Sequence, residues 1–399
     1  MSSHPLDAHP LDAWALDPHV RHLNHGSFGA VPRVTLDALR ELRTEMDANP
    51  CRWFRALPER VALARAEIAR YLRVSPEALA LVPNASAGIS TVLGSLDLPA
   101  GSEVLLTDHS YGAVTMGVRR AAERTGAHVR TLHVPLDATP EEIAALFADA
   151  LGDTARPTSL VVVDQVTSAT ARLFPVADIA AHAHAAGALV LVDGAHAPGM
   201  LADPLGDAGD ADFWVGNLHK WPCAPRGTAA LVARGDLAQR LHPVIDSWGA
   251  PYPFPERFDQ QGTVDLAPWL AAPRSLDFVE ERFGWDAARH HMGELAGEAQ
   301  RLLADTLDAD TSTVGGSPAP AMRLVPLPAG VAADQDAAHA LQRHLADATA
   351  CETAITTWNG HGFLRVSAHL YNDGKDYAHL ADTLPAALAA SSASSASRS

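Results

Sequence analysis

Ala188-Leu-Val-Leu-Val-Asp193 and Phe213-Trp-Val-Gly216 are short apolar runs, and polar residues follow each of them at once: Gly-Ala-His196 after the first and Asn-Leu-His-Lys220 after the second. Runs of this length and composition are typical of buried strands in a parallel sheet. Ligands of an open parallel sheet bind beyond the carboxyl ends of its strands, where loops and helix N-termini converge. We therefore look for function in the polar residues that end these runs.

Similar runs recur on both sides of this stretch. Between Val34 and Asp265, strand-like runs alternate with helical patterns, which predicts an α/β fold with a mostly parallel sheet covered by helices on both faces. The other strand-like runs cover residues 103–108, 160–166 and 228–233, and the helical patterns cover residues 34–47, 59–72, 117–125, 140–151 and 176–186. Two of these runs end in further polar clusters, at residues 108–111 and 164–168.

The composition and the pattern of apolar residues change after Pro268. Longer Ala-rich helical stretches follow, with a Gly and Pro cluster at residues 315–320 and a strand-like run at residues 363–367. A chain of 399 residues is also long for one core, since domains average about 150 residues. We predict a large domain over residues 20–267, a smaller α+β domain formed by residues 1–19 and 268–390, and a disordered Ser and Ala tail over residues 391–399.

Composition and charge argue against several classes of protein. A net charge of -17 without any run of Lys and Arg disfavours binding to a nucleic acid or to an anionic membrane. No apolar stretch reaches the ~20 residues of a membrane-spanning helix. The three cysteines are widely spaced and the first twenty residues do not resemble a signal peptide, so we expect a cytoplasmic protein. Neither a Gly-rich dinucleotide fingerprint nor a ligand set of zinc spacing is present, so we expect no nicotinamide cofactor and no metal.

Lys220 and Asp193 carry the strongest chemical indication. Lys220 lies among apolar and aromatic neighbours, and desolvation there favours the free amine that a Schiff-base lysine requires. The alternative is an ordinary surface lysine. Asp193 ends a buried strand and therefore needs a cationic partner, which a protonated pyridine nitrogen would supply. The alternative for Asp193 is a structural carboxylate that caps the following turn.

An anion site is indicated by Asn84-Ala-Ser-Ala-Gly88, which opens a helix of small residues after Val82 and Pro83. The backbone N–H groups at a helix start and a nearby hydroxyl are suited to a phosphate. Helix capping by a serine explains the same pattern equally well.

Several motifs, taken in order, resemble one family. They are Leu23-Asn-His-Gly-Ser-Phe-Gly29, Asn49-Pro50 with Arg52 and Phe54, Asp193-Gly-Ala-His196, Gly216-Asn-Leu-His-Lys-Trp221, Gly262-Thr-Val-Asp265 and Leu364-Arg-Val-Ser367 before Tyr371. Together they resemble the class V aminotransferase-fold enzymes that use pyridoxal 5'-phosphate, and within them the isopenicillin N epimerase-like subgroup. The resemblance spans about residues 20–385. It implies fold type I, with a seven-stranded sheet, and a small-molecule amino-acid substrate.

The resemblance also implies site residues. Lys220 would form the Schiff base, Asp193 would pair with the pyridinium nitrogen, and His196 would lie beside the ring near its phenolic oxygen. The other implied contacts are, for the cofactor, Ala85, Ser86, His109, Tyr111, Ser168, Asn217, His219 and Thr263, and, for the substrate, Asn24, His25 and Arg365. Either His109 or Tyr111 would stack on the ring. Thr263 matches the position that reaches the phosphate of the neighbouring subunit, so a homodimer with shared active sites is implied.

Two positions depart from the pattern of the subgroup. Where the epimerase has a histidine and a proline around the corresponding serine, this chain reads Asp164-Gln-Val-Thr-Ser168-Ala169, which suggests that a histidine facing the ring or the substrate is missing. Arg226 stands where a small neutral residue is expected, and it could add a second contact to an anion.

The implied chemistry leaves several reactions open. A freed Lys220 would remove the α-proton of the substrate, and the ring would delocalise the carbanion. Reprotonation on the opposite face gives epimerisation, which we favour, with His25, His109 and Tyr111 as candidates for the second proton donor. Loss of a β-thiol would instead make the protein a C–S lyase, and decarboxylating oxidative deamination is a further alternative. A non-catalytic binding protein with this fold is the alternative of another class.

Overall fold

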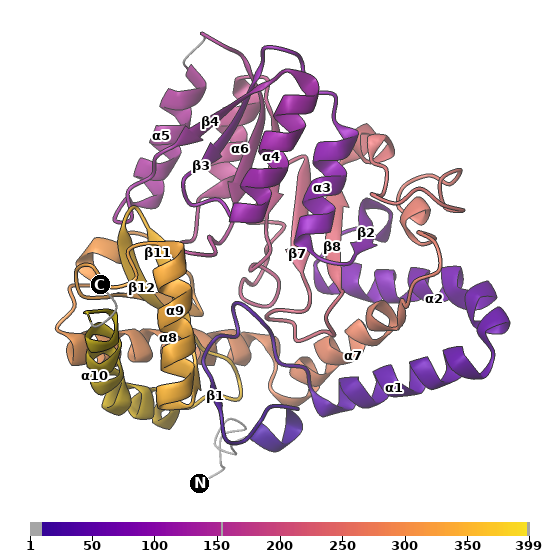
Figure 1. Cartoon of the computed structure of the whole chain (residues 1–399). Coiled ribbons are helices and arrows are strands. Elements are labelled where there is room, and N and C mark those ends of the chain that lie inside the picture. Colours follow the sequence, from indigo (N-terminus) through magenta and orange to yellow (C-terminus); the bar gives the residue numbers. More distant parts are fainter. Residues whose placement is uncertain (1–9, 153–154, 397–399) are drawn as a thin grey trace.

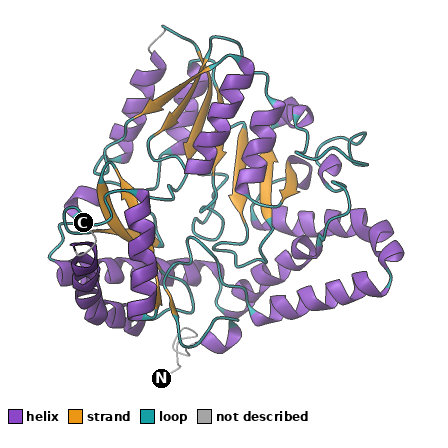
Figure 2. Cartoon of the chain, in the orientation of Figure 1, coloured by secondary structure: helices purple, strands orange, loops and turns teal. Residues whose placement is uncertain are grey.

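The computed structural model describes residues 10–152 and 155–396, and its central feature is a seven-stranded sheet with helices on both faces (Figures 1 and 2). In spatial order the strands are β2 (Leu79–Val82), β8 (Ala229–Ala233), β7 (Phe213–Asn217), β6 (Leu189–Asp193), β5 (Thr158–Asp164), β3 (Glu103–Thr107) and β4 (His128–Leu132). Neighbouring strands run parallel from β7 to β4, whereas β8 is antiparallel to both β7 and β2. The predicted α/β fold with a mostly parallel sheet is confirmed.

Helices cover the two faces of this sheet because successive side chains of each strand point to opposite faces. The helices of the large domain are α1 (Arg33–Ala48), α2 (Pro50–Tyr71), α3 (Ala85–Ser95), α4 (Gly112–Thr125), α5 (Pro140–Gly152) and α6 (Val176–Ala185). Val104 and Leu106 of β3 pack with α3 and α4 on one face, while Leu105 packs with α5 and α6 on the other. Among the described residues, no helix combines the length and apolar character needed to span a bilayer.

Residues 267–396 contain a second sheet, and we keep the predicted names, large and small domain, for the part with the seven-stranded sheet and for this part. Helix α7 (Ala267–Arg282) leads into α8 (Trp285–Leu307), and these are followed by β9 (Met322–Pro326), α9 (Gln335–Thr349), β10 (Cys351–Glu352), β11 (Ala354–Trp358), β12 (His361–Ser367) and α10 (Gly374–Ala396). Strands β11, β12 and β9 form an antiparallel sheet. Short 3-10 helices are η1 (Pro10–Ala13), η2 (Pro76–Ala78), η3 (Gly235–Arg240), η4 (Glu256–Phe258) and η5 (Ser312–Val314).

Two predicted boundaries differ from the structure. Strand β1 (Arg21–His22) pairs with β10, so the chain segment at residue 20 joins the small domain instead of opening the large one. Helix α10 continues to Ala396, so the prediction of a disordered tail from residue 391 is wrong for residues 391–396. Alanine is the strongest helix former, which lets the Ser and Ala stretch extend the helix. Residues 1–9 and 397–399 lie outside the described residues.

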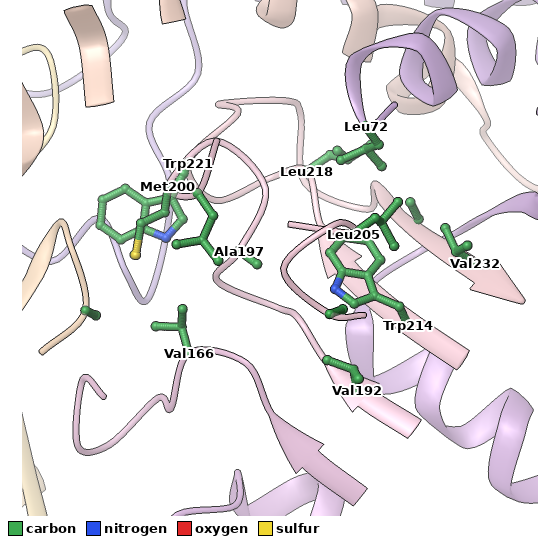
Figure 3. Close-up of a cluster of buried hydrophobic side chains, with 14 of the residues drawn as sticks. Leu72, Val166, Val192, Ala197, Met200, Leu205, Trp214, Leu218, Trp221 and Val232 are labelled. Atoms are coloured by element: carbon green, nitrogen blue, oxygen red, sulfur yellow. The ribbon is translucent and has the colours of Figure 1, made fainter. Parts of the chain in front are cut away.

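The turn that follows β7 is anchored in the core of the large domain. Leu218 and Trp221 are fully buried. Figure 3 shows Trp221 beside Met200 and Ala197 of the segment that follows β6, and Leu218 beside Leu72 at the end of α2. Because apolar side chains on both sides of Lys220 are fixed in the core, the backbone of this turn is held in place. The turn therefore presents Lys220 from a rigid base.

Candidate active site

Three strands end at one cavity. Asp164, Asp193 and Asn217 are the last residues of β5, β6 and β7, and all three line a cavity of about 590 Å³. The start of α3, residues 26–29 and part of α9 contribute further lining. This is the edge of the sheet at which the sequence predicted the site.

Lys220 projects into this cavity and meets a histidine. Its Nζ lies 2.9 Å from His196 Nε2. Burial lowers the pKa of Lys220 to about 7, and the positive charge of the nearby Arg365 guanidinium contributes to this shift. The negative charges of Asp193 and Asp164 oppose it. A large fraction of the amine is therefore unprotonated near neutral pH and can act as a nucleophile.

His196 is neutral and has one nitrogen unused. Burial, together with the positive charges of Lys220 and Arg365, holds the pKa of His196 well below its ordinary value. Its Nδ1 is buried and has no hydrogen-bond partner among the described residues. A buried polar atom without a partner is costly, so this nitrogen is suited to contact a ligand in the cavity.

Asp193 and Asp164 form a pair of buried carboxyl groups on neighbouring strands, where they are partners in the sheet register. Asp193 accepts a hydrogen bond from the backbone N–H of Ala195, at 3.0 Å. No lysine or arginine of the described chain forms an ion pair with either carboxyl. Burial raises the pKa of both groups, and the neighbouring Asp193 raises that of Asp164 further. The two carboxyl groups can therefore supply a negative charge that would form an ion pair with a cationic ring nitrogen.

The start of α3 offers one free backbone donor to the cavity. The N–H of Ala85 donates to Asn217 Oδ1 and the N–H of Ala87 donates to Asn84 Oδ1, both at 2.9 Å. This leaves the N–H and hydroxyl of Ser86 to face the cavity, at the positive end of the helix dipole. Ser86 is therefore the better placed of the two predicted contacts at this helix, and Asn217 fixes the helix start.

His219 and Thr263 complete the predicted phosphate contacts in different ways. His219 lines the cavity and donates from Nδ1 to the Thr228 carbonyl, at 3.1 Å. Burial and the neighbouring Lys220 lower the pKa of His219 to about 4. Thr263 is exposed and does not line the cavity of its own chain.

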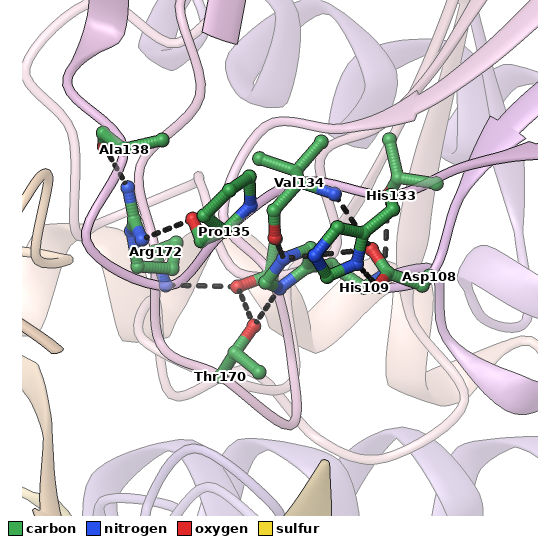
Figure 4. Close-up of polar contacts among 10 residues, drawn as sticks. Asp108, His109, His133, Val134, Pro135, Ala138, Thr170 and Arg172 are labelled. Atoms are coloured by element: carbon green, nitrogen blue, oxygen red, sulfur yellow. Dashed lines mark hydrogen bonds and ion pairs between the residues drawn. The ribbon is translucent and has the colours of Figure 1, made fainter. Parts of the chain in front are cut away.

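His109 and Tyr111, the two candidates for stacking on the ring, lie in different places. Tyr111 precedes α4 and lines the cavity. His109 is buried outside the lining, where Nδ1 contacts Thr170 Oγ1 and Nε2 donates to the Val134 carbonyl, both at 2.7 Å (Figure 4). Its ring stacks on Trp358 of β11 instead. Only Tyr111 is available to cover a cofactor in this structure.

The predicted substrate residues form a layer behind the cavity lining. Arg365 of β12 is buried and donates to the Ser168 carbonyl at 2.6 Å, to Ser27 Oγ at 2.7 Å and to Asn24 Oδ1 at 3.2 Å. Ser27 and Ser168 line the cavity, whereas Asn24, His25 and Arg365 do not. The Nε of Arg365 is buried without a partner among the described residues. The guanidinium therefore lies directly behind the lining and is paired only with neutral acceptors.

The two departures from the subgroup pattern also lie in different places. Gln165 points away from the cavity, where it accepts from Trp214 Nε1 at 2.9 Å and donates to the Pro204 carbonyl at 2.7 Å. Gln165 is therefore not part of the lining, whereas Asp164, Val166 and Ser168 of the same segment are. Arg226 does line the cavity, is exposed, and has no acidic partner among the described residues.

Several lining residues were not predicted as site residues, and Asp164, His339 and Gln342 are three of the polar ones. Asp164 is, like Asp193, a carboxylate that ends an apolar run, and this pattern was sufficient to predict it as a site residue. His339 and Gln342 reach the cavity from α9, and nothing in their helical pattern indicates this position.

These residues fit pyridoxal phosphate. One cavity is lined by a desolvated lysine amine, two buried carboxyl groups without a cationic partner among the described residues, a histidine nitrogen without a partner there, and a helix start. They match the aldehyde, the ring nitrogen, the phenolic oxygen and the phosphate of that cofactor.

Comparisons of sequence place the chain among known proteins. The profile of the family described as "Aminotransferase class-V" matches residues 29–380. The chain is 34% identical over 396 residues to isopenicillin N epimerase of Streptomyces clavuligerus, a match that covers 93% of this chain and 96% of that protein. It is 32% identical to the isopenicillin N epimerase of Amycolatopsis lactamdurans, with the same coverage. A putative L-cysteine desulfhydrase of Oryza sativa subsp. japonica is 30% identical and is covered to 82%.

Comparison of structures supports the same fold. The cystine C–S lyase C-DES in complex with its product, cysteine persulfide, superposes with a TM-score of 0.78 at 21% sequence identity, and the match covers 92% of this chain and 97% of that one. A C-DES mutant with glycine covalently linked to its PLP cofactor gives a TM-score of 0.79 at 20% identity, with 92% and 96% covered. This chain belongs to the class-V aminotransferase family and is a pyridoxal phosphate-dependent enzyme.

Proposed function

We propose that the protein epimerises the α-carbon of an amino-acid substrate related to isopenicillin N. Two isopenicillin N epimerases match almost their whole length at 34% and 32% identity, which supports this reaction over others of the family. The observation that carries the proposal is the free amine of Lys220 in the same cavity as the Tyr111 phenol, because epimerisation needs two groups that exchange protons.

The residues of the chain divide the work of this reaction. Bound pyridoxal phosphate supplies an electron sink for the negative charge that develops at the α-carbon. Lys220 Nζ takes the α-proton, and its lowered pKa suits it to do so near neutral pH. Arg365 donates to Ser168 and Ser27, which line the cavity, and it would hold the substrate carboxylate by exchanging these neutral acceptors for it, because a planar guanidinium offers two parallel donors. By fixing the carboxylate, Arg365 orients the α-hydrogen toward one of the two proton-transferring groups.

Tyr111 is the second proton donor in this proposal. Of the three candidates that the sequence offered, His25 and His109 lie outside the lining and use both ring nitrogens in hydrogen bonds. Tyr111 lines the cavity, and its hydroxyl has no hydrogen-bond partner among the described residues. The phenol would also cover the cofactor ring.

The Tyr111→Phe variant, compared with wild type in deuterated water, tests this assignment. Removal of the hydroxyl keeps the aromatic ring but removes the second proton. We expect Tyr111→Phe to incorporate deuterium at the α-carbon with retention, while inversion falls about 100-fold or more. Equal loss of exchange and inversion would contradict the role of Tyr111, and exchange without inversion in wild type would contradict the epimerase.

C–S bond cleavage is the second candidate. The putative L-cysteine desulfhydrase of Oryza sativa is 30% identical to this chain, which favours a lyase among the remaining reactions. The same incubation distinguishes the two. Release of pyruvate, ammonia and hydrogen sulfide from an amino acid with a β-thiol would identify the lyase, whereas inversion without release supports the epimerase. Carbon dioxide with ammonia would indicate decarboxylating deamination.

A homodimer with shared active sites is part of the proposal. Thr263 is exposed and absent from the cavity of its own chain, as expected of a residue that serves the partner. Large apolar side chains of the same loop region and of α4 are exposed: Met116, Val244, Ile245, Trp248 and Val264. Exposed apolar side chains of this size favour a protein interface. Light scattering of wild type should give twice the chain mass, and a monomer with full cofactor affinity would contradict the shared site. We further propose that this dimer resides in the cytoplasm.

A further inference from the structure

Two stacked histidines lie beneath the Lys220 turn and contact its main chain. The rings of His25 and His369 are 3.9 Å apart at their centroids with an angle of 14° between their planes, and both side chains are fully buried. His25 lies in the segment after β1, and His369 lies two residues beyond the end of β12. Neither residue lines the cavity.

Each histidine donates to one of two successive carbonyl groups. His25 Nε2 donates to the Lys220 carbonyl at 3.0 Å, and His369 Nε2 donates to the Trp221 carbonyl at 3.1 Å. Burial holds the pKa of His25 well below its ordinary value and lowers that of His369 to about 3, so both rings are neutral. His25 Nδ1 must then accept the hydroxyl hydrogen of Tyr371, at 2.8 Å.

Two further contacts surround the carbonyl group of Lys220. The N–H of Cys223 also donates to the Lys220 carbonyl, at 2.8 Å. Gly29 packs so closely that a β-carbon there would lie 2.3 Å from the His219 carbonyl oxygen and 2.7 Å from that of Lys220. Only glycine fits at this position. The main chain of Lys220 is thus fixed by His25, Cys223 and Gly29, while its side chain enters the cavity.

A metal does not explain this cluster, although Cys223 Sγ lies 3.4 Å from His369 Nε2 and 4.0 Å from His25 Nε2. Both Nε2 atoms carry a hydrogen that is donated to a carbonyl, so neither offers a lone pair. The two rings are also nearly parallel, and parallel rings do not direct their nitrogens at one ion with tetrahedral geometry.

We propose that His25 and His369 are positioning residues that set the direction of the Lys220 amine, and that His25 exchanges no proton with substrate. The contacts of His25 and its neighbours also connect the part of the site that holds Lys220 with the part that holds Arg365. Asn24 and Ser27 lie on either side of His25, and both contact Arg365. Arg365 lies near the end of β12, and His369 lies two residues beyond that end. The same short segment, residues 24–27, therefore contacts both the Lys220 carbonyl and Arg365. This inference rests on the proposed role of Lys220 but not on which reaction follows.

The test compares His25→Gln with His25→Phe in the full-length, cofactor-loaded protein. Gln places an amide donor near the position of Nε2, whereas Phe keeps the ring shape without a donor. The first measurement is the pH midpoint of the cofactor absorption band without substrate, which is independent of the reaction. We expect His25→Phe to move this midpoint by about one pH unit and to lower kcat about 100-fold with KM within about threefold, and His25→Gln to stay close to wild type.

His379→Phe is the matched control, because His379 Nε2 donates to the Thr349 carbonyl at 2.8 Å in the small domain, away from the cavity. It should lower the thermal midpoint without moving the absorption midpoint. An unchanged absorption midpoint and kcat in His25→Phe would overturn the proposal. Loss of proton exchange in His25→Gln with a wild-type midpoint would also overturn it, since His25 would then be a proton donor. If His25→Phe does not fold, the result for His25→Gln decides alone.

Discussion

The wall of the cavity formed by the seven-stranded sheet differs from the wall formed by residues 24–29 and the end of β12. On the sheet wall, Asp164, Asp193, His196 and Lys220 face the cavity directly and have few partners in the protein. On the second wall, Arg365 and His25 lie behind the lining. His25 uses both ring nitrogens, and Arg365 donates from both Nη atoms to neutral groups while its Nε has no partner among the described residues. Unpaired charge on the first wall suits a cofactor, whereas the packed layer on the second wall fixes geometry. We call them the sheet wall and the outer wall.

The largest effect should come from Lys220 on the sheet wall. Lys220→Ala removes both the covalent anchor and the base, so we expect turnover to fall by about 1000-fold or more. The protein contains one other lysine, Lys375, which is exposed in α10. Lys375→Ala is therefore a matched control that should keep wild-type turnover. Equal activity of the two variants would remove Lys220 from the mechanism.

The two carboxyl groups of the sheet wall should respond unequally. Asp193→Asn removes the negative charge that pairs with the ring nitrogen, and we expect about a 100-fold loss of turnover. Burial raises the pKa of both carboxyl groups, but the Ala195 N–H and the Lys220 charge oppose this rise at Asp193, whereas Asp193 adds to it at Asp164. We therefore expect the charge of the pair to reside on Asp193. Asp164→Asn should therefore cost less than about tenfold in steady-state turnover. The reverse order would show that the charge resides on Asp164.

A change on the outer wall should affect the substrate more than the cofactor. Arg365→Gln removes the guanidinium, and we expect kcat/KM to fall about tenfold to 100-fold, mostly through KM, while the cofactor spectrum stays unchanged. Arg365 also lowers the pKa of Lys220, so this pKa should rise in the variant. NMR titration of isotopically methylated amines can measure the rise, because only two lysines are present. A fall in the Lys220 pKa would contradict the proximity of the two groups.

The smallest effect concerns pH. The pKa of Lys220 lies at about 7 in the cofactor-free chain, and only the unprotonated amine reacts with an aldehyde. The rate of cofactor uptake should therefore increase about tenfold per pH unit below pH 7 and level off above it. Stopped-flow absorbance measures this rate. A midpoint near the ordinary lysine value of 10.5 would show that the amine is solvated.

The sequence predicted the sheet wall because its residues follow apolar strands directly. Strands β3, β5, β6, β7 and β8 are buried and were recognised by their apolar runs. Two strands of the seven-stranded sheet were missed for physical reasons. Three of the four residues of β2 are Leu or Ala, which favour helices, and β4 is an edge strand with polar residues on both sides of Val129. Helix α2 starts earlier than predicted, because Asn49 caps it and Pro50 occupies its first turn.

The outer wall could not be derived from local pattern. His25 and His369 are far apart in sequence, and their stacking depends on how the small domain packs against the Lys220 turn. His109 shows the converse case. It follows β3 as a site residue would, but Thr170, Val134 and Trp358 hold it in the core. A strand end therefore indicates where a residue lies but not which way its side chain turns.

The most direct test of the central claim is reduction of the loaded protein with borohydride, followed by peptide mass spectrometry. The claim is that the Lys220 amine, on the sheet wall, forms the Schiff base with pyridoxal phosphate. With two lysines in the chain, the modified peptide identifies the attachment point without ambiguity. We expect a pyridoxyl adduct on Lys220 and none on Lys375. An adduct on Lys375, or a loaded protein that yields no adduct, would contradict it.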